Sequence, residues 1–308
     1  MMKKTVLITG GGGFVGRHLI DELNREWTGA RIVVWDRPDV DITEPGTYLE
    51  SLKETQPEWV VHLAAFASVG DSYEQEELVH KVNVEATQRL LEAIEKYSPD
   101  TKVLAVSSAD IYGLAVRAHS GEPLPELALS QAKPSNPYAQ SKLDMEKMIE
   151  DRFNDRVVRV RPFPHIGPGQ REGFVTADFA SQIVAIEKKK QDPVIKVGNL
   201  VAKRDFTDVR DVARAYRLLM EKGASGEVYH VASGQAVGIE EVLEKLLALS
   251  PAKIRIFQDP EKMRPSDVPV LCGSAEKLYE LTGWEATTPL SRSLEDILNW
   301  WREGTRLP

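Results

Sequence analysis

Short apolar runs rich in β-branched residues alternate with amphipathic stretches along the first half of the chain. The runs lie at residues 5–9, 31–35, 59–65, 102–108 and 156–162. Between them, in stretches such as 14–27 and 83–97, apolar residues repeat every three to four positions, which is the period of a helix. Alternating strands and helices form a parallel sheet with helices packed on both faces. The pattern therefore predicts an α/β fold with a doubly wound parallel sheet.

The pattern changes after residue 162, where the segment 162–173 is dense in proline and glycine and predicts a loop. Further elements follow in a less regular order. Helices are predicted at 177–190, 208–223, near 239–249, 274–281 and 291–302, and strands at 194–197 and 227–232. We therefore expect a first domain over 1–162, with returning segments near 206–235, and a smaller, mainly substrate-binding C-terminal α/β lobe over 163–308.

Composition narrows the classes of partner. The formal net charge of -8, without a dense run of lysine and arginine, argues against a nucleic-acid partner. Cys272 is the only cysteine, which excludes an internal disulfide and a thiolate zinc site and is typical of a cytoplasmic protein. The first apolar run is about five residues long and ends in glycines, so it predicts a strand rather than a secretion signal. No stretch reaches the roughly 20 apolar residues that span a bilayer, and we expect neither a membrane segment nor a metal.

A glycine loop follows the first predicted strand. Gly10, Gly13 and Gly16 are spaced G-x-x-G-x-x-G and open the first predicted helix. Glycines at such a turn let the backbone approach a pyrophosphate, whose charge is attracted by the amino terminus of the helix. This context predicts a Rossmann-type site for a dinucleotide.

Two acidic residues and an arginine bear on the choice of cofactor. Asp36 ends the second predicted strand, where a carboxylate bonds both hydroxyls of an adenosine ribose and repels a 2′-phosphate, so NAD(H) is favoured. Arg37 follows directly and could pair with that phosphate, which leaves NADP(H) open. Asp41, in the segment 41–43, either faces the adenine or caps a helix.

Tyr138 and Lys142 are four positions apart, a spacing that puts both side chains on one face of a helix. Ser108 follows the fourth predicted strand at its carboxyl end, where ligands bind in open α/β sheets. A phenol with a pKa of about 10 needs a nearby cation to exchange protons at neutral pH. We expect Lys142, together with the positively charged nicotinamide, to lower the pKa of Tyr138, and Ser108 to hydrogen-bond and orient the reacting oxygen.

These residues, together with Asn83 in the segment 81–87, resemble the extended short-chain dehydrogenase/reductase family over essentially the whole chain. The resemblance implies that Ser108, Tyr138 and Lys142 are catalytic, and that Asn83 relays protons and fixes the lysine through water. It also implies a set of cofactor-binding residues. These are Gly10, Gly13, Phe14, Val15, Gly16, Asp36, Arg37, Asp41, Ile42, Leu63, Ala64, Ala65, Tyr138, Lys142 and His165.

Three further segments, 167–183, 197–216 and 264–273, resemble the branch of that family that acts on nucleotide sugars. The nearest likeness is to members that reduce GDP-4-keto-6-deoxy-D-mannose to GDP-D-rhamnose, and the next is to GDP-mannose 4,6-dehydratases. Two guanidinium groups on separate loops can clamp a diphosphate. The expected substrate contacts are Ser68, Asp110, Val175, Asp178, Arg204 and Arg264. A carboxylate at Asp178 would accept from the guanine N–H groups or stabilise a helix amino terminus, and Val175 and Thr176 would pack along the base.

A reductase and a dehydratase differ in what they need beside the tyrosine. A dehydratase must remove a proton from carbon 5, which calls for a further carboxylate. Asp110 occupies that place, but the dehydratases of the family carry a longer glutamate there. A reductase needs hydride from a nicotinamide and a proton from Tyr138, and it is the favoured hypothesis. Pro164 stands where the family commonly has an asparagine, so any substrate contact of that amide is lost.

Alternatives stay open at several points. A dehydratase or epimerase would recycle its bound cofactor, whereas a non-catalytic dinucleotide sensor would not need the proton relay. The resemblance also implies a homodimer through a four-helix bundle, with the apolar residues of 90–94 and 145–149 either in that contact or in the core. His165 either touches the nicotinamide carboxamide or only packs. We expect His62 to pack in the core, and Ser107 to bond its own backbone.

Overall fold

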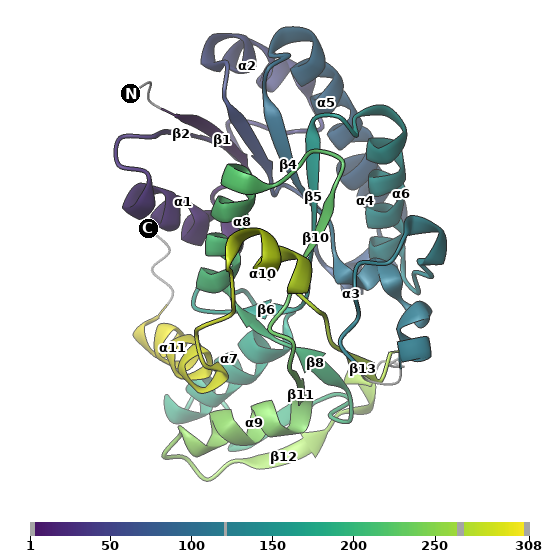
Figure 1. The fold of residues 1–308 in the computed structure, drawn as a ribbon. Coiled ribbons are helices and arrows are strands. Elements are labelled where there is room, and N and C mark those ends of the chain that lie inside the picture. Colours follow the sequence, from purple (N-terminus) through teal and green to yellow (C-terminus); the bar gives the residue numbers. More distant parts are fainter. Residues whose placement is uncertain (1–3, 120–121, 264–267, 305–308) are drawn as a thin grey trace.

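The computed structural model describes residues 4–119, 122–263 and 268–304. At its centre is a 6-stranded parallel sheet in the order β10-β5-β4-β3-β1-β2 (Figure 1). The strands are β1 (Thr5–Thr9), β2 (Arg31–Trp35), β3 (Trp59–His62), β4 (Lys102–Val106), β5 (Val157–Pro162) and β10 (Val228–Val231). The strand order reverses direction beside β1, and the carboxyl edge at such a point is where open α/β sheets bind ligands. The predicted fold class is confirmed.

Helices cover both faces of this sheet. One face carries α1 (Phe14–Glu26), α8 (Val209–Lys222) and α10 (Glu276–Thr282), and the other carries α2 (Leu49–Thr55), α5 (Ala86–Tyr97) and α6 (Pro137–Arg152) (Figure 1). Because neither face meets water, successive side chains of a strand are apolar and buried, as Val6, Leu7 and Ile8 are in β1. Each flanking helix turns one apolar face inward, as α8 does with Val212 and Leu219.

A second, smaller group of elements lies below the carboxyl edge of the sheet in Figure 1 and has a core of its own. Its helices are α7 (Val175–Glu187), α9 (Ile239–Ala248) and α11 (Leu290–Glu303). Its strands pair as β6 (His165–Ile166) with β9 (Thr207–Asp208), β7 (Val194–Val197) with β12 (Arg255–Gln258), and β11 (Ala236–Gly238) with β8 (Lys203–Asp205) and β13 (Val270–Leu271). Between these strands the chain returns to the large sheet through α8 and β10.

Several predicted elements have different ends in the structure. The strands predicted to reach residues 65 and 108 end at His62 and Val106, because the chain then leaves the sheet to form loops at its carboxyl edge. The helix predicted at 83–97 starts earlier and is continuous through α4 (Glu76–His80), the π-helical η2 (Lys81–Glu85) and α5. The helix predicted to reach residue 190 ends at Glu187, since Lys189 has a φ of 58° in the left-handed region. The short helices are α3 (Val69–Ser72), η1 (Pro45–Thr47), η3 (Ala109–Tyr112), η4 (Leu114–His119), η5 (Leu129–Gln131) and η6 (Pro260–Lys262).

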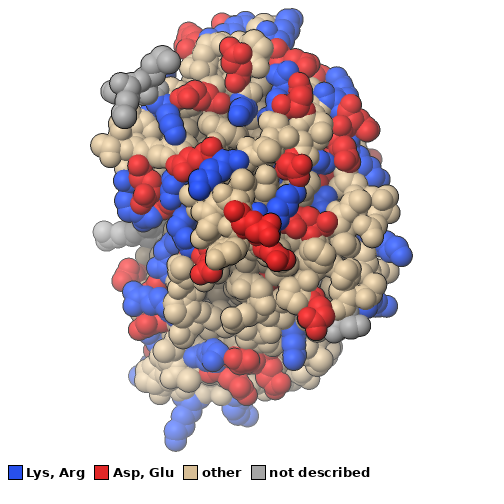
Figure 2. Space-filling view, viewed as in Figure 1, with Lys and Arg blue, Asp and Glu red and all other residues tan. Residues whose placement is uncertain are grey.

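Charged side chains of both signs are interspersed over the face seen in Figure 2, rather than gathered into one basic surface. Within the described ranges, no helix is both long enough and apolar enough to cross a bilayer. An anionic ligand of this protein must therefore be held by a few placed cations or by backbone N–H groups, and not by a general positive field.

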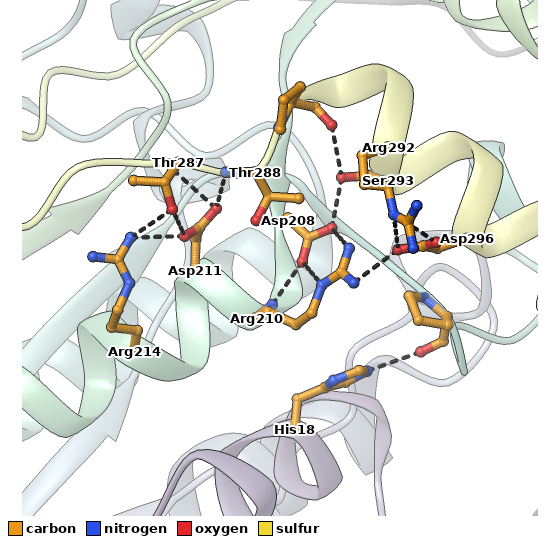
Figure 3. A network of polar contacts seen from close by, with 12 residues as sticks. His18, Asp208, Arg210, Asp211, Arg214, Thr287, Thr288, Arg292, Ser293 and Asp296 are labelled. Atoms are coloured by element: carbon orange, nitrogen blue, oxygen red, sulfur yellow. Dashed lines mark hydrogen bonds and ion pairs between the residues drawn. The ribbon is translucent and has the colours of Figure 1, made fainter. Parts of the chain in front are cut away.

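A buried ion-pair network fastens α11 to the start of α8 (Figure 3). The Asp208 carboxylate accepts from Arg210 Nε at 2.7 Å and Nη2 at 2.8 Å, and from the hydroxyl of Ser293 at 2.6 Å. Arg210 also reaches Asp296 of α11 at 2.7 Å. One turn further along α8, Asp211 accepts from the backbone N–H of Thr288 at 2.8 Å. These contacts fix the C-terminal helices to the element that underlies the large sheet.

We expect Asp208→Ala to lower the free energy of unfolding by about 2–3 kcal/mol, because the Ser293 hydroxyl and part of Arg210 lose their buried partner. The half-exposed Arg210 can regain water, which keeps the loss in that range. Denaturant unfolding followed by circular dichroism measures it. Glu50→Ala is the matched control, since the Glu50 side chain is 79% exposed in its pair with Lys53 and should change stability by less than about 0.5 kcal/mol. Equal losses in the two variants would contradict the assignment.

Candidate active site

The glycine loop packs so closely that side chains would not fit. Gly10 has a φ of +70°, and a Cβ there would lie 2.9 Å from the Ala64 nitrogen. A Cβ on Gly16 would lie 2.5 Å from Gly11 Cα. The loop ends at Gly13, the N-cap of α1, whose first N–H groups are left for a ligand. A backbone cradle at a helix amino terminus fits the pyrophosphate of a dinucleotide.

Asp36 is fixed over this loop. Its Oδ2 accepts from the Gly12 N–H at 2.7 Å, and its Oδ1 accepts from the Arg37 N–H at 2.9 Å. The carboxylate thus lies at the carboxyl end of β2 beside the predicted pyrophosphate cradle, as a group that recognises the adenosine ribose must. Sequence reasoning missed the contact with Gly12, because nothing in the motif says which of its glycines faces the acid.

Asp41 has a local role. Its Oδ1 accepts from the Thr43 N–H at 2.8 Å and from the Thr43 hydroxyl at 2.7 Å, and these bonds lower the pKa of the carboxyl. The residue caps a turn and not a helix, so the helix-cap alternative is wrong. Ile42 beside it is buried.

The loop after β3 lies against the glycine loop. The N–H of Leu63 donates to the Thr9 carbonyl at 3.1 Å, and that of Ala64 donates to the Thr9 hydroxyl at 3.2 Å. Leu63, Ala64 and Ala65 are half-buried beside Gly10. Ser68, predicted as a substrate contact, uses its hydroxyl oxygen to cap α3 by accepting from the Asp71 N–H at 3.2 Å.

His165 and Ser107 have different surroundings. His165 stacks on the ring of Phe14, with ring centroids 6.0 Å apart and planes at 4°, so both line the start of α1 beside Val15. Burial lowers the pKa of His165, and the neutral ring bonds the Phe163 carbonyl. Ser107 is buried as predicted, but its hydroxyl has no partner among the described residues, so the predicted bond to its own backbone is wrong.

The predicted catalytic side chains meet at the carboxyl edge of β4. Ser108 caps η3, where its hydroxyl accepts from the Asp110 N–H at 3.1 Å. Tyr138 lies in the first turn of α6, whose N-cap Asn136 accepts from Ala139 at 2.8 Å. Lys142 lies one turn further on, 4% exposed, and its Nζ donates to the Val106 carbonyl at the end of β4 at 2.8 Å.

Burial determines most of the electrostatics of this group. It raises the pKa of Tyr138 above its ordinary value, Asp110 raises it further, and a hydrogen bond with Ser108 opposes both. Burial lowers the pKa of Lys142 to about 8, and the Lys142 ammonium bonds the Val106 carbonyl. The expectation that Lys142 and a positively charged nicotinamide together lower the pKa of Tyr138 stays a prediction. Tyr138 is a protonated phenol at neutral pH.

Asp110 belongs to the large group of elements and Arg204 to the small one. The charge of Arg204 acts on the Asp110 carboxyl. Burial raises the pKa of Asp110, and the Arg204 charge opposes that shift. Arg204 is half-buried and donates to the carbonyls of Lys203 at 2.8 Å and Val268 at 3.0 Å. Arg264, the predicted second clamp, lies outside the described residues.

The residues predicted to hold the base gather at the start of α7. Val175 is half-buried there, and Asp178 accepts from the Gly173 N–H at 2.7 Å. That bond supports the helix-terminus interpretation of Asp178. Thr176 is fully buried and donates to Gln170 at 3.0 Å, so the expectation that it packs along the base is wrong.

Asn83 is buried in the π-helical turn η2. Its carboxamide accepts from the Phe66 N–H at 2.8 Å and donates to the Phe66 carbonyl at 3.1 Å and to the Ser141 hydroxyl at 2.9 Å. The side chain thus joins the loop after β3 to α6. This arrangement suits a positioning role, and the proton relay stays a prediction.

Sequence reasoning missed a buried charge network behind the site. Arg161 of β5 donates to both oxygens of Glu146 in α6, at 2.9 and 2.8 Å, and to the Tyr112 hydroxyl at 2.7 Å. The Tyr112 hydroxyl in turn contacts His230 of β10. The available signal was an arginine inside a strand that the pattern placed in the buried centre of the sheet.

The strand order, the glycine cradle, Asp36 and the Ser108, Tyr138 and Lys142 group define a class: a nicotinamide-dependent enzyme of the extended short-chain dehydrogenase/reductase type. Residues 6–232 match the NAD dependent epimerase/dehydratase family, and the chain belongs to that family.

Particular proteins are similar to this chain over most of its length. The chain is 34% identical over 314 residues to GDP-6-deoxy-D-mannose reductase of Pseudomonas aeruginosa, with 99% of each chain covered. It is 30% identical over 284 residues to GDP-6-deoxy-D-talose 4-dehydrogenase of Aggregatibacter actinomycetemcomitans, covering 90% of this chain and 91% of that one. Among solved structures, RMD from Pseudomonas aeruginosa complexed with NADPH superposes with a TM-score of 0.88 at 33% identity, covering 98% of this chain and 100% of that one.

We expect Lys142→Met to make the folded protein more stable and to slow its turnover. The folded-state pKa of about 8 lies below the 10.5 of an ordinary lysine, so protonated Lys142 costs the folded state free energy. The variant should gain about 1–3 kcal/mol at pH 7. That gain is full below about pH 8 and should vanish as the pH approaches 10.5, where the unfolded lysine is also losing its proton.

Denaturant unfolding of the cofactor-free protein between pH 6 and 10 measures this profile. Turnover should fall by about 10²–10⁴-fold. The control is Lys147→Met, because the Lys147 side chain is 51% exposed and should show neither effect. A variant that is less stable than the wild type at pH 7, or whose gain does not depend on pH, would refute the assignment.

Proposed function

We propose that this protein reduces a nucleotide-linked 4-keto-6-deoxy sugar, GDP-4-keto-6-deoxy-D-mannose to GDP-D-rhamnose, with NADH or NADPH. The full-length similarity to a GDP-6-deoxy-D-mannose reductase and to a second enzyme named for a GDP-6-deoxy sugar supports the GDP-sugar substrate class. Similarity to GDP-mannose 4,6-dehydratase is weaker, at 26% over 80% of this chain.

The observation that carries the proposal is the full-length similarity to a GDP-6-deoxy-D-mannose reductase, and the surroundings of Tyr138 are compatible with it. A reduction at carbon 4 produces an alkoxide, which needs a proton at the moment it forms. Burial and the Asp110 charge keep the Tyr138 proton in place until then.

The remaining residues have defined tasks in this proposal. The reduced nicotinamide, when bound, supplies the hydride. Ser108 hydrogen-bonds the sugar oxygen and orients it toward Tyr138. Lys142 then stabilises the negative charge of the phenolate that remains. Arg204, together with Arg264, holds the diphosphate.

The quaternary structure is part of the proposal as well. The residues first expected in a helical dimer contact, Leu90, Ile94, Met145 and Ile149, are buried within the subunit because they face the sheet. Support for a homodimer comes instead from Tyr73 and Leu78, which are 61% and 42% exposed beside α4, a helix that packs on α6. We propose a cytoplasmic homodimer.

The direct test mixes the purified protein with GDP-4-keto-6-deoxy-D-mannose and either reduced nicotinamide. We expect one cofactor oxidised per sugar consumed, and GDP-D-rhamnose identified by NMR. Tyr138→Phe should lower kcat by about 10²–10⁴-fold, because the proton donor is lost. Dehydration or epimerisation of a nucleotide sugar without added reductant would overturn the proposal, and cofactor binding without any turnover would favour a sensor.

Cofactor choice gives a second prediction. Asp36→Ala removes the charge that faces the ribose, so the ratio of kcat/KM for NADPH over NADH should rise by about 10-fold or more. Asp39→Ala is the matched control, because Asp39 is exposed three positions away and should leave the ratio unchanged. An unchanged ratio in both variants would show that Asp36 does not recognise the adenosine ribose of the cofactor.

A further inference from the structure

His62 lies at the centre of a buried chain of hydrogen bonds that starts at the glycine loop. The Ala64 N–H donates to the Thr9 hydroxyl at 3.2 Å, and Thr9 Oγ1 contacts His62 Nδ1 at 2.8 Å. On the other side of the ring, His62 Nε2 contacts Thr87 Oγ1 at 2.8 Å. The Thr87 hydroxyl then donates to the Asn83 carbonyl at 2.8 Å. All the side chains of this chain are buried, with Thr9 and Thr87 at 0% and 1% exposure and His62 at 3%.

The geometry determines which group donates in each hydrogen bond of this chain of side chains. A carbonyl can only accept, so the Thr87 hydroxyl donates its one proton to the Asn83 carbonyl. His62 Nε2 must therefore carry a hydrogen and donate to Thr87. Burial and the nearby Lys142 charge lower the pKa of His62 to about 3, so the ring is neutral and Nδ1 is a bare acceptor. Thr9 donates to it, and the chain runs one way from Ala64 to Asn83.

The chain ends on the Asn83 backbone carbonyl, and the Asn83 side chain reaches the catalytic helix from there. The Asn83 amide donates to the Ser141 hydroxyl at 2.9 Å, and Ser141 donates to the Tyr138 carbonyl at 2.7 Å. The residue at one end, Thr9, is bonded directly to Gly10 in the cofactor loop. The residue at the other end, Tyr138, is the predicted proton donor. Asn83 lies in a π-helical turn, a distortion often found at functional sites.

We infer that His62 is a positioning residue, which holds the cofactor loop and the Tyr138 helix in register by donating to one threonine and accepting from the other. No other side chain type of similar size offers a donor and an acceptor on opposite edges of a rigid ring. Register matters because a displacement of about 1 Å between reacting groups can reduce the rate of a chemical step by about 10²-fold. The inference deepens the proposed function and rests on it for turnover, but cofactor binding can be measured without the sugar.

The test breaks the chain at two points that do not touch. Thr9→Val and Thr87→Val keep the branched shape of the side chain but delete its hydroxyl, which leaves one ring nitrogen of His62 without a partner. Each should lower kcat by about 10-fold or more, with a smaller rise in the KM of the sugar. The double variant should be little slower than the slower single variant, because a chain already broken loses nothing more at its second break. Effects that multiply in the double variant would overturn the inference.

Replacing His62 itself separates positioning from mere packing. A glutamine amide keeps one donor and one acceptor, so His62→Gln should recover part of the rate, whereas His62→Leu should not. Should His62→Leu fail to fold, the pair Thr87→Ser, which keeps the hydroxyl, and Thr87→Val decides the same question. Equal rates for Thr87→Ser and Thr87→Val would contradict the role.

A matched control excludes a general effect of stability. Thr101 is also buried, at 2%, and its hydroxyl donates to the Pro57 carbonyl at the opposite, amino edge of the sheet. Thr101→Val should lower the melting temperature about as much as Thr87→Val and leave kcat unchanged. A loss of kcat in Thr101→Val as large as in Thr87→Val would refute the inference.

Cofactor affinity distinguishes failure of this inference from failure of the proposed function. NADH and NADPH binding, followed by fluorescence, should weaken in Thr9→Val and Thr87→Val but not in Thr101→Val. If the wild type shows no reductase activity while this binding pattern holds, the proposed function fails and the positioning role stands. If the wild type is an active reductase and the binding of all three variants is unchanged, the positioning role fails alone.

Discussion

The buried ion pair between Arg161 and Glu146 is the constraint on which the rest of the site depends. Both side chains are essentially inaccessible, at 1% and 0% exposure. Removing two charges from water costs several kcal/mol per ion, and only good geometry with further hydrogen bonds offsets that cost. The bidentate contact of Arg161 with Glu146 provides this geometry, and the Tyr112 hydroxyl and the Leu127 carbonyl accept the two N–H groups of Arg161 Nη1. The pair can therefore exist in only one arrangement of its neighbours.

That arrangement sets the distances in the site. Glu146 lies on the same helix as Tyr138 and Lys142, and Tyr112 ends the short helix that Ser108 caps. Arg161 thus ties the helix with the proton donor to the turn with the serine. Its strand lies between β4 and β10, so the tie is anchored in the centre of the sheet. A site built on strands and helices holds its groups more accurately than one built on loops.

The same pair explains how an isolated lysine is tolerated. Glu146 is four residues from Lys142 and raises its pKa, but burial lowers that pKa more. Because Arg161 already neutralises Glu146, Lys142 gains little from it and relies on the Val106 carbonyl. The Lys142 charge lowers the stability of the folded state, and the surrounding packing offsets that loss. Such a cost is expected at a site where a charge serves chemistry rather than stability.

The sequence predicts the sheet, the cofactor loop and the position of the Ser108, Tyr138 and Lys142 group, because these follow from period, spacing and strand ends. It fails where a side chain can bond either a neighbour or a ligand, as for Asp41 and Thr176, since such local bonds leave no trace in the periodicity. It also fails for Glu146 and Arg161, which are far apart in the chain and meet only through the order of the strands. Long-range polar pairs need the topology before they can be seen.

The charges around Tyr138 bear on where its proton stays. Asp110 and burial both favour the protonated phenol, and Arg204 moderates the effect of burial on Asp110. A protonated tyrosine can give its proton to the negative charge that forms when a carbonyl carbon receives hydride. Asp110 therefore acts on the proposed donor from the position at which reductases and dehydratases of this family were expected to differ.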